Sequence, residues 1–501
     1  MMADFDLLSV QEARNLLQRA REAQKKLAEL SQEQIDRIVE NMALEAEKHA
    51  SFLARMATEE TGFGNETDKT TKNLFAAKEV YAAIKDMKTV GIIGIDENKQ
   101  VWEIAEPVGV IAGVVPSTNP TSTIIFKSLI AVKARNAIVF SPHPSALKCS
   151  LEAAKIMAKT AQDAGAPKNI IQCMEYPSLP GTRELMSHKL TDVILATGGP
   201  GMVKAAYSSG KPAYGVGPGN VPVYVHTSAD LDQAARHIIE SKAFDYGTIC
   251  ASEQAVVVER EIKQAFMDKL KKYGAYLLSE TEKERVESII LTEGSLNPKI
   301  VGKSPQAIGK MAGLSFPTEV KVLVGEEKEI GKNIPFAIEK LSPILALYTV
   351  DGWEEGCDVC IRLLETGGLG HTLGIHCQDH AVIKAFALKQ PASRIVVNSG
   401  TTFGGIGATT GIFPSLTLGC GSYGNNITSD NIGPQHLMNV KRVAFGIREM
   451  NNTTKSETLQ SVKITDVSET GKNVSIDQGG NLTISREEIT EIVKRILAEM
   501  K

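Results

Sequence analysis

The sequence predicts an α/β fold in which helices cover both faces of mostly parallel sheets. Apolar, strand-like runs alternate with helix-like segments between residues 108 and 196, and the alternation resumes between residues 344 and 398. Such alternation is typical of parallel sheets, whose strand ends form a crevice for nucleotides. With 501 residues, 43% of them hydrophobic, the chain can bury more than one core. We therefore expect two α/β domains that face each other across a cleft.

Composition excludes several classes of function. The formal charge of -4 provides no basic surface for nucleic acid. No run of about 18 apolar residues could span a bilayer, and residues 1–6 lack the basic start and apolar core of a signal peptide. The seven cysteines are scattered and sparse, which is typical of a reducing compartment. We expect a cytoplasmic protein without a nucleic-acid or membrane partner.

The N-terminal region is predicted to be helical. Ser9-Val10-Gln11-Glu12 and Ser31-Gln32-Glu33-Gln34 have the form of a capping box, and a segment with helical apolar spacing follows each of them. From residue 91 the pattern changes to two strand-like runs, 91–95 and 101–104, about a polar turn. We interpret the helices as packing elements and the hairpin as an arm for oligomerisation.

The first alternation defines a cofactor-binding domain that we place at residues 1–226, with the arm at 91–105 inserted. Its predicted strands are 108–115, 137–140, 170–174 and 193–196, and its predicted helices include 121–134 and 145–164. No Gly-x-Gly-x-x-Gly fingerprint follows these strands. The nearest feature is the turn Thr197-Gly198-Gly199-Pro200-Gly201 before a helix that contains Met202. This turn allows a dinucleotide to approach the backbone, and tight packing explains it equally well.

Cys250 lies between a helical pattern at 229–243 and an apolar strand pattern at 255–258. Gly247 has no side chain and allows close backbone approach, so the thiol can point into a cleft. A single cysteine is more often a small buried hydrophobe. The motifs elsewhere in the chain favour a nucleophile instead.

Six motifs carry a resemblance to a known family. They are Glu106-Pro107-Val108-Gly109-Val110, Pro116-Ser117-Thr118-Asn119-Pro120, Gly217-Pro218-Gly219-Asn220-Val221-Pro222, Ile249-Cys250-Ala251-Ser252-Glu253-Gln254, Glu339-Lys340-Leu341-Ser342-Pro343 and Gly368-Leu369-Gly370-His371-Thr372. Over roughly residues 5 to 450, a span suited to a multidomain enzyme, the chain resembles the CoA-acylating branch of the aldehyde dehydrogenase superfamily. The resemblance implies a Rossmann-like cofactor domain, a catalytic domain at 227–430 and a small β oligomerisation arm.

The resemblance implies catalytic roles for three residues. Cys250 matches the nucleophile, and Asn119 matches the asparagine whose amide, with the cysteine's own N–H, holds the oxyanion. Fixed donors suit this chemistry because thiolate attack on an aldehyde builds negative charge on oxygen. His371 matches a histidine of the acylating branch, which would position the acyl group or assist thiol deprotonation. A turn residue before Pro120 and a satisfied structural histidine are the alternatives for Asn119 and His371.

The resemblance also implies NAD as the cofactor and coenzyme A as a cosubstrate. Glu339 matches the glutamate that holds the nicotinamide ribose. His143, in Ser141-Pro142-His143-Pro144, occupies the place where many members have a lysine for the adenine ribose, so NADP is an alternative. The expected cofactor-binding residues are Pro116, Ser117, Thr118, Ser141, Pro142, His143, Thr197, Gly198, Gly199, Met202, Gly217, Glu339 and Leu341. No metal site is expected, because Cys357 and Cys360 have no second pair and lie on a helical pattern.

Val216 departs from the pattern of hydrolytic members. At this place those members have a run similar to Glu-Leu-Gly-Gly, in which the glutamate activates water. This chain has Val216-Gly217-Pro218-Gly219 instead. A thiol needs less activation, because with a pKa of about 8.5 a few per cent of it is thiolate at neutral pH. We expect CoA-acylating oxidation of propanal or acetaldehyde. The alternatives are an acyl-CoA reductase, a dehydrogenase for a longer or carboxylated aldehyde, and a catalytically silent scaffold protein.

The C-terminal part is predicted to serve assembly. Residues 431–450 resemble a strand that joins a neighbouring subunit, which implies a homodimer or homotetramer. Residues 451–484 have the polar composition of a flexible linker. Residues 485–501 form a predicted amphipathic helix, with a capping box at 485–488 and an apolar stripe of Ile489, Ile492, Val493, Ile496, Leu497 and Met500. The helix resembles peptides that carry enzymes into bacterial microcompartments by binding a shell protein, and docking on its own domain is the alternative.

Overall fold

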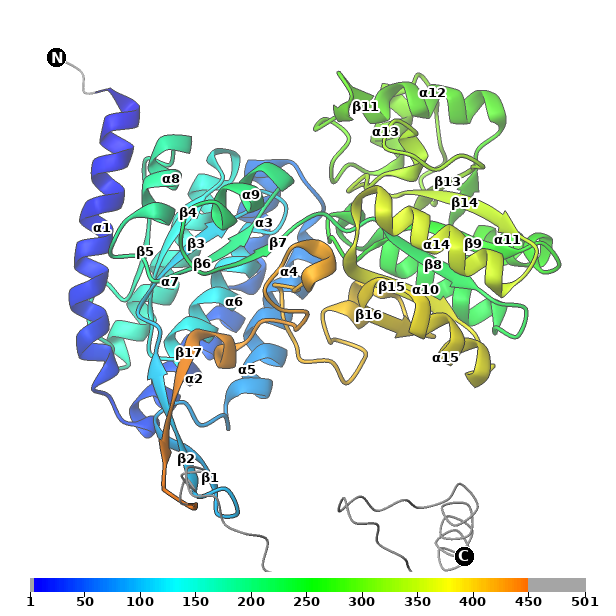
Figure 1. Cartoon of the computed structure of the whole chain (residues 1–501). Coiled ribbons are helices and arrows are strands. Elements are labelled where there is room, and N and C mark those ends of the chain that lie inside the picture. The colour runs from blue at the N-terminus through cyan, green and yellow to red at the C-terminus, as the bar shows by residue number, and fades with distance from the viewer. Residues whose placement is uncertain (1–3, 449–501) are drawn as a thin grey trace, which may run out of the picture. The chain divides into compact units, whose positions relative to one another are not determined.

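The computed structural model describes residues 4–448, so the predicted linker at 451–484 and amphipathic helix at 485–501 lie outside the described residues. In the described part, the chain forms two parallel sheets with helices around them, a three-stranded antiparallel sheet and a short two-stranded one (Figure 1). The predicted α/β fold with parallel sheets is confirmed. No helix among residues 4–448 is both long and apolar enough to cross a membrane.

The N-terminal helices confirm one predicted cap and correct the other. Ser31 and Gln34 form a capping box at the start of α2. The box predicted at Ser9 is wrong, because α1 already begins at Phe5 and Asp4 caps it. Ser9 is buried and accepts a hydrogen bond from the Ser178 N–H at 3.1 Å, so its hydroxyl serves a tertiary contact. The helices are α1 (Phe5–Ala28), α2 (Gln32–Lys48), α3 (Ala50–Thr61) and α4 (Glu66–Leu74).

The first parallel sheet has five strands in the order β5-β4-β3-β6-β7. Every residue of β3 and β4 is buried, which explains their continuous apolar runs, since helices cover both faces of such a sheet. Helix α1 packs on α8, and α2 packs on α6 and α7. The elements are β3 (Val110–Val115), α6 (Pro120–Lys133), β4 (Ala137–Pro142), α7 (Leu147–Asp163), β5 (Ile171–Cys173), α8 (Leu179–Ser187), β6 (Val193–Thr197), α9 (Pro200–Tyr207) and β7 (Ala213–Val216).

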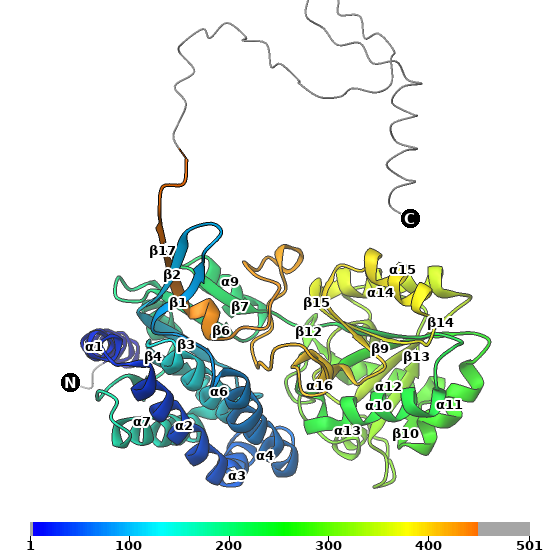
Figure 2. The same ribbon diagram turned by 90° about the horizontal axis from the view of Figure 1, so that it is seen from below.

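The second parallel sheet has seven strands in the order β10-β13-β14-β9-β8-β15-β16. Figure 2 shows this sheet with α10 and α11 on one side and α14 and α15 on the other. The elements are β8 (Val221–Val225), α10 (Leu231–Ala243), β9 (Glu253–Glu259), α11 (Lys263–Lys272), β10 (Ala275–Leu277), α12 (Glu280–Ile290), β13 (Val322–Glu326), β14 (Ile344–Val350), α14 (Trp353–Gly367), β15 (Gly370–His376), α15 (His380–Lys389) and β16 (Ala392–Val397).

The structure corrects the expected boundary after residue 226. Strand β8 lies before that boundary, yet it pairs with β9 and β15 in the second sheet. The physical reason is burial: β8 is apolar and buried along its whole length, which requires strands on both sides and cover on both faces. The chain therefore passes from the first sheet to the second between β7 and β8.

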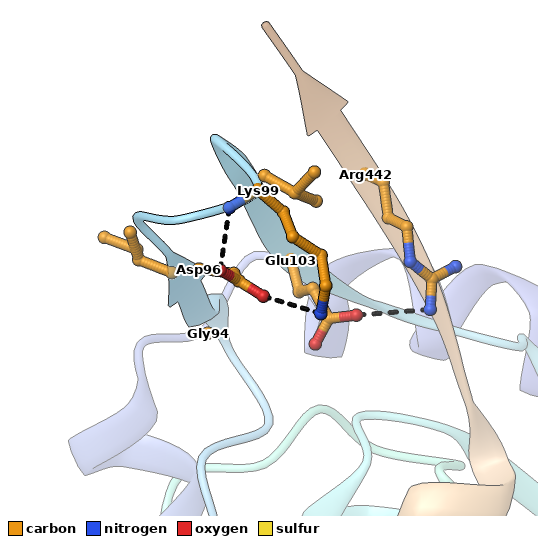
Figure 3. A pocket seen from close by; sticks show the side chains of 7 residues that line it. Gly94, Asp96, Lys99, Glu103 and Arg442 are labelled. Atoms are coloured by element: carbon orange, nitrogen blue, oxygen red, sulfur yellow. Dashed lines mark hydrogen bonds and ion pairs between the residues drawn. The ribbon is translucent and has the colours of Figure 1, made fainter. Parts of the chain in front are cut away.

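The predicted hairpin is confirmed as β1 (Gly91–Asp96) and β2 (Val101–Pro107), which pair antiparallel. A third strand, β17 (Met438–Ala444), pairs with β2 of the same chain, from Met438 opposite Pro107 to Ala444 opposite Val101. β17, which was expected to join a neighbouring subunit, is therefore the edge strand of the chain's own arm. A hollow of about 430 Å³ opens on this arm, and ion pairs of Lys99 with Asp96 and of Arg442 with Glu103 line it (Figure 3).

Candidate active site

The segment between α10 and β9 carries Cys250 and has an unusual backbone. Asp245 and Tyr246 adopt left-handed conformations with φ of 48° and 51°, and Gly247 follows with φ of 73°. A Cβ on Gly247 would lie 2.8 Å from the Ser342 carbonyl oxygen, so only glycine fits there. The close backbone approach predicted at Gly247 is thus confirmed, and it joins the Cys250 segment to the loop that contains Glu339.

Three predicted site residues meet around Gly219, in the turn between β7 and β8. A Cβ on Gly219 would lie 2.1 Å from the Cys250 carbonyl oxygen and 3.1 Å from Nδ1 of His371. The Gly219 N–H donates to Oε1 of Glu339 at 2.9 Å. The structure therefore brings together Cys250 before β9, His371 near the start of β15 and Glu339 before β14.

Burial raises the pKa of both the thiol and the carboxyl group in this cluster. Burial raises the pKa of Cys250 to about 12, and the charge of the nearby Glu339 adds to that increase. The Arg394 guanidinium and the N–H of Cys250 itself act in the opposite direction. Burial also raises the pKa of Glu339 to about 7. Cys250 is therefore a thiol at neutral pH until a proton acceptor or a bound ligand changes its surroundings.

His371 is buried and neutral. Burial, with the charge of Arg394, lowers the pKa of its ring to about 3. Its Nδ1 lies 3.0 Å from Oγ1 of Thr372, while Nε2 has no partner within the part of the chain that the structure describes. A neutral imidazole with one unsatisfied nitrogen can form one hydrogen bond to a substrate, although it is a weak proton acceptor. The unsatisfied Nε2 favours a ligand contact over a fully satisfied structural histidine.

Asn119 precedes α6, at the carboxyl end of β3, and its side chain points to the Cys250 segment. Its Nδ2 donates to Oγ1 of Thr118 at 3.1 Å and, at 3.4 Å, to the carbonyl oxygen of Thr248, two residues before Cys250. Its Oδ1 accepts a hydrogen bond from Nζ of Lys72. The amide is therefore held by groups on three separate segments of the chain.

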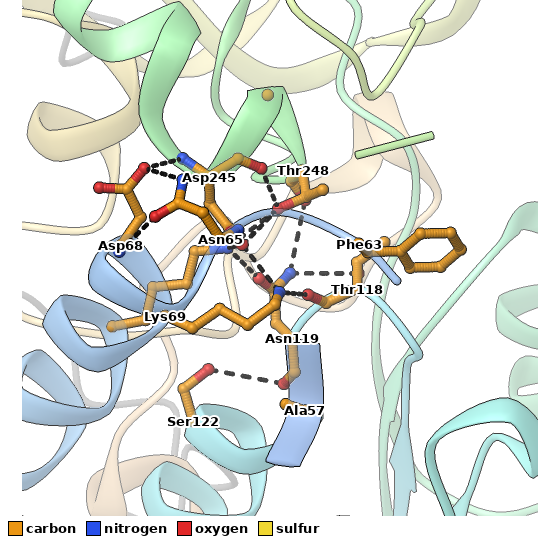
Figure 4. Close-up of polar contacts among 12 residues, drawn as sticks. Ala57, Phe63, Asn65, Asp68, Lys69, Thr118, Asn119, Ser122, Asp245 and Thr248 are labelled. Atoms are coloured by element: carbon orange, nitrogen blue, oxygen red, sulfur yellow. Dashed lines mark hydrogen bonds and ion pairs between the residues drawn. The ribbon is translucent and has the colours of Figure 1, made fainter. Parts of the chain in front are cut away.

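Lys69, Lys72 and Asp245 form a buried charge cluster that the sequence did not predict. Figure 4 labels Lys69 and Asp245 of this cluster. The two lysines of α4 are 3% and 4% exposed, and Asp245 is fully buried. Burial lowers the pKa of Lys72 to about 8, although Asp245 opposes this effect. From the sequence, two lysines three residues apart on a helix indicate a solvated face, so no local signal could have revealed the cluster.

The expected cofactor contacts of the first domain lie at one edge of the five-stranded sheet. Residues 116–118 follow β3, Ser141 and Pro142 end β4 with His143 directly after it, residues 197–199 end and follow β6, and Gly217 follows β7. Since the strands are parallel, these carboxyl ends share an edge, where nucleotides bind in doubly wound folds.

Several features of this edge fit a dinucleotide. Oγ1 of Thr197 is buried without a hydrogen-bond partner in the described residues. A Cβ on Gly199 or Gly217 would meet no atom within 4 Å, so the backbone is open to a ligand at both places. The side chain of Met202 packs against Gly198.

Two of the residues expected to contact the cofactor are less accessible to a ligand. Ser141 is buried, and its hydroxyl lies 2.7 Å from that of Thr182, so the exposed His143 is the accessible group at the end of β4. Leu341 lies in the Glu339 loop of the second domain, with φ of 46°, and its carbonyl oxygen accepts a hydrogen bond from the Gly302 N–H at 2.8 Å.

Cys357 and Cys360 are both buried in the core on α14.

Comparisons with known proteins show similarity to one family. The family model for the aldehyde dehydrogenase family matches residues 1–285. The bifunctional aldehyde-alcohol dehydrogenase of Escherichia coli K12 is 46% identical over 441 residues, which are 87% of this chain and 50% of that protein. The chain thus spans about half the length of the first curated relatives it matches.

Two solved structures share the fold. An acetylating aldehyde dehydrogenase from Geobacillus thermoglucosidasius is 64% identical with a TM-score of 0.89, covering 90% of this chain and all of that one. A propionaldehyde dehydrogenase from the fucose utilisation bacterial microcompartment of Clostridium phytofermentans is 28% identical with a TM-score of 0.79, covering 86% and 97%.

Proposed function

Because the chain belongs to the aldehyde dehydrogenase family, we propose that it oxidises a short aliphatic aldehyde, propanal or acetaldehyde, to the corresponding acyl-CoA. The observation that carries this proposal is the side chain of Val216. It ends β7, is 4% exposed and pairs with Thr197 of β6, so no carboxylate stands there to activate water. The names of the Geobacillus and Clostridium proteins, an acetylating and a propionaldehyde dehydrogenase, support the same reaction.

In this proposal Cys250 forms two covalent species in turn. After its proton passes to solvent, the sulfur attacks the aldehyde carbon, and the oxygen becomes an oxyanion that Asn119 Nδ2 and the Cys250 N–H stabilise. Glu339 and the carboxyl edge of the first sheet would hold NAD, which would supply the acceptor for the hydride that leaves this carbon. The thioester on Cys250 is then attacked by the CoA thiolate, which releases acyl-CoA and the Cys250 thiolate, and the thiolate takes up a proton from solvent. The free Nε2 of His371 positions the acyl group for this second attack.

The proposal is tested by NADH formation with propanal, acetaldehyde or butanal, with and without CoA, and by identification of the acyl-CoA product. Cys250→Ala should abolish the reaction without unfolding the protein, because only the thiol is removed. Cys173→Ala, on β5, is the matched control and should remain active. Appreciable turnover by Cys250→Ala would refute the nucleophile. A wild-type protein that is inactive in both directions with every aldehyde would favour the scaffold alternative.

The amphipathic segment 485–501 is proposed to bind a microcompartment shell protein, which would place the enzyme in the cytoplasm inside such a compartment. The origin of the Clostridium relative supports this proposal. Fusion of residues 485–501 to a fluorescent protein should direct it to shells, and Ile492→Glu with Ile496→Glu should disperse it. Co-purification of the truncated enzyme with shells would refute the role of the segment.

Assembly into a homodimer or homotetramer through the β1-β2-β17 arm is likewise proposed. The two outer strands of the arm carry exposed apolar side chains. Ile95 on β1 is 58% exposed and Val443 on β17 is 38% exposed. Light scattering should give a dimer or tetramer mass, and Ile95→Lys with Val443→Lys should reduce it. A monomeric wild-type protein would contradict the arm's role.

A further inference from the structure

Lys72 occupies a position that no motif of the sequence accounts for. Its ammonium group has three acceptors, which are Oδ1 of Asn119, Oδ2 of Asp245 and Oγ1 of Thr248 at 3.0 Å. An ammonium group has three donors, so these contacts satisfy it completely. Because Lys72 is 4% exposed, water does not compete for the same donors.

The contact with Asn119 determines which end of the amide faces the Cys250 segment. An ammonium group can only donate, so the amide oxygen must face Lys72 and the amide nitrogen must face the other way. Nδ2 then has one ordinary contact, with Thr118 at 3.1 Å, and one long contact, with the Thr248 carbonyl oxygen at 3.4 Å. The long contact leaves a donor that a stronger acceptor can capture.

We propose that Lys72 is a positioning residue, which holds the Asn119 amide in the one orientation that presents Nδ2 to the oxyanion formed at Cys250. This inference rests on the proposed function for the role of Asn119. A charged donor on the amide oxygen also polarises the amide, which strengthens the N–H on its far side. Lys72 itself does not touch the reacting atoms in this arrangement.

Lys69 provides a matched control within the same cluster. It lies one turn earlier on α4, is 3% exposed, and donates to Oδ2 of Asp245 at 2.9 Å. Its second contact is the Thr118 carbonyl oxygen at 3.0 Å, and it has no contact with the Asn119 amide. Replacement of either lysine by methionine leaves Asp245 paired with the other lysine, so both variants keep a neutral buried ion pair.

The experiment is a double-mutant cycle on acylation of Cys250 by p-nitrophenyl acetate, which needs neither NAD nor CoA. The thiol proton passes to solvent, sulfur attacks the ester carbon, the C=O electron pair moves to oxygen, and collapse expels p-nitrophenolate as the C–O bond breaks. Loss of an oxyanion donor costs about 10²–10³ in rate, so a misplaced donor in Lys72→Met should slow the burst about 10- to 100-fold. The burst rate of Lys69→Met should stay within about threefold of the wild type, because Lys69 does not contact the Asn119 amide.

The decisive comparison is Lys72→Met in the Asn119→Ala background, where it should cause no further loss, because Lys72 acts through Asn119. Equal effects of the two lysine variants, or additive effects of Lys72→Met and Asn119→Ala, would overturn the proposal. If Lys72→Met does not melt cooperatively, Lys72→Leu, which also removes every donor to Oδ1, replaces it under the same criteria.

The same variants are compared in steady-state, CoA-dependent turnover of aldehyde to NADH, where kcat should fall and KM for NAD should not change. A wild-type protein that gives the ester burst without CoA-dependent NADH formation would refute the proposed function, while the cycle would still decide the role of Lys72.

Discussion

Replacement of Gly219 by alanine should impair catalysis far more than folding. The glycine does not have a positive φ, so alanine adds no backbone strain, and it keeps the N–H that donates to Glu339. The new methyl group would lie 2.1 Å from the Cys250 carbonyl oxygen, whereas ordinary contacts begin at 3.4 Å. The Cys250 backbone must therefore move by ~1 Å, a displacement that can cost about 100-fold in rate.

A 100-fold loss corresponds to about 2.7 kcal/mol in the barrier. The assay is a single turnover of aldehyde to NADH without CoA, followed by steady-state turnover with CoA. Gly331→Ala is the control, since a Cβ there meets only Ile334, at an ordinary 3.7 Å. Turnover by Gly219→Ala within threefold of the wild type, with unchanged melting of both variants, would show that the Cys250 geometry does not limit the reaction.

Three further predictions concern the same site. Without CoA or another thiol, NADH formation should stop after one equivalent per active site, and sustained release of free acid would show that some group other than residue 216 activates water. Because burial and Glu339 raise the pKa of Cys250 to about 12, the fraction of thiolate, and with it the alkylation rate of the Cys250 peptide, should still rise about tenfold per pH unit between about pH 7 and 10. A plateau below about pH 9, measured with iodoacetamide and mass spectrometry in the absence of NAD, would contradict this. Gly247→Ala should lower the free energy of unfolding by at least about 1–2 kcal/mol, because φ is 73° and its Cβ would collide with Ser342; an unchanged urea midpoint would contradict the assigned backbone conformation.

The sequence predicted those parts of the fold that depend on local patterns. Strands such as β3 and β9 are buried on both faces, so their apolar runs are visible in any window of the sequence. The capping box at Ser31 was equally local. Ser9 has the same pattern, but its hydroxyl binds Ser178, and a contact across that distance leaves no trace in the neighbouring residues.

The candidate site divides in the same way. Cys250, Asn119, His371 and Glu339 belong to motifs that a family resemblance can identify. Lys72 does not, since its importance depends on two residues, Asn119 and Asp245, that lie far from it in the sequence. The left-handed backbone of Asp245 and Tyr246 was also unpredictable, because such conformations are uncommon for residues other than glycine.

The pairing of β17 with β2 has a consequence for folding during synthesis. The ribosome makes β2 long before β17, and at about 5–20 residues per second the interval is roughly 15–65 s. For that time β2 is an open strand edge, the kind of surface on which chains aggregate. Glu103 and Glu106 place negative charges along it, which keep identical edges on neighbouring nascent chains apart. Arg442 and Lys441 of β17 later pair with these two glutamates, so the charges that repel other copies of β2 select its own last strand.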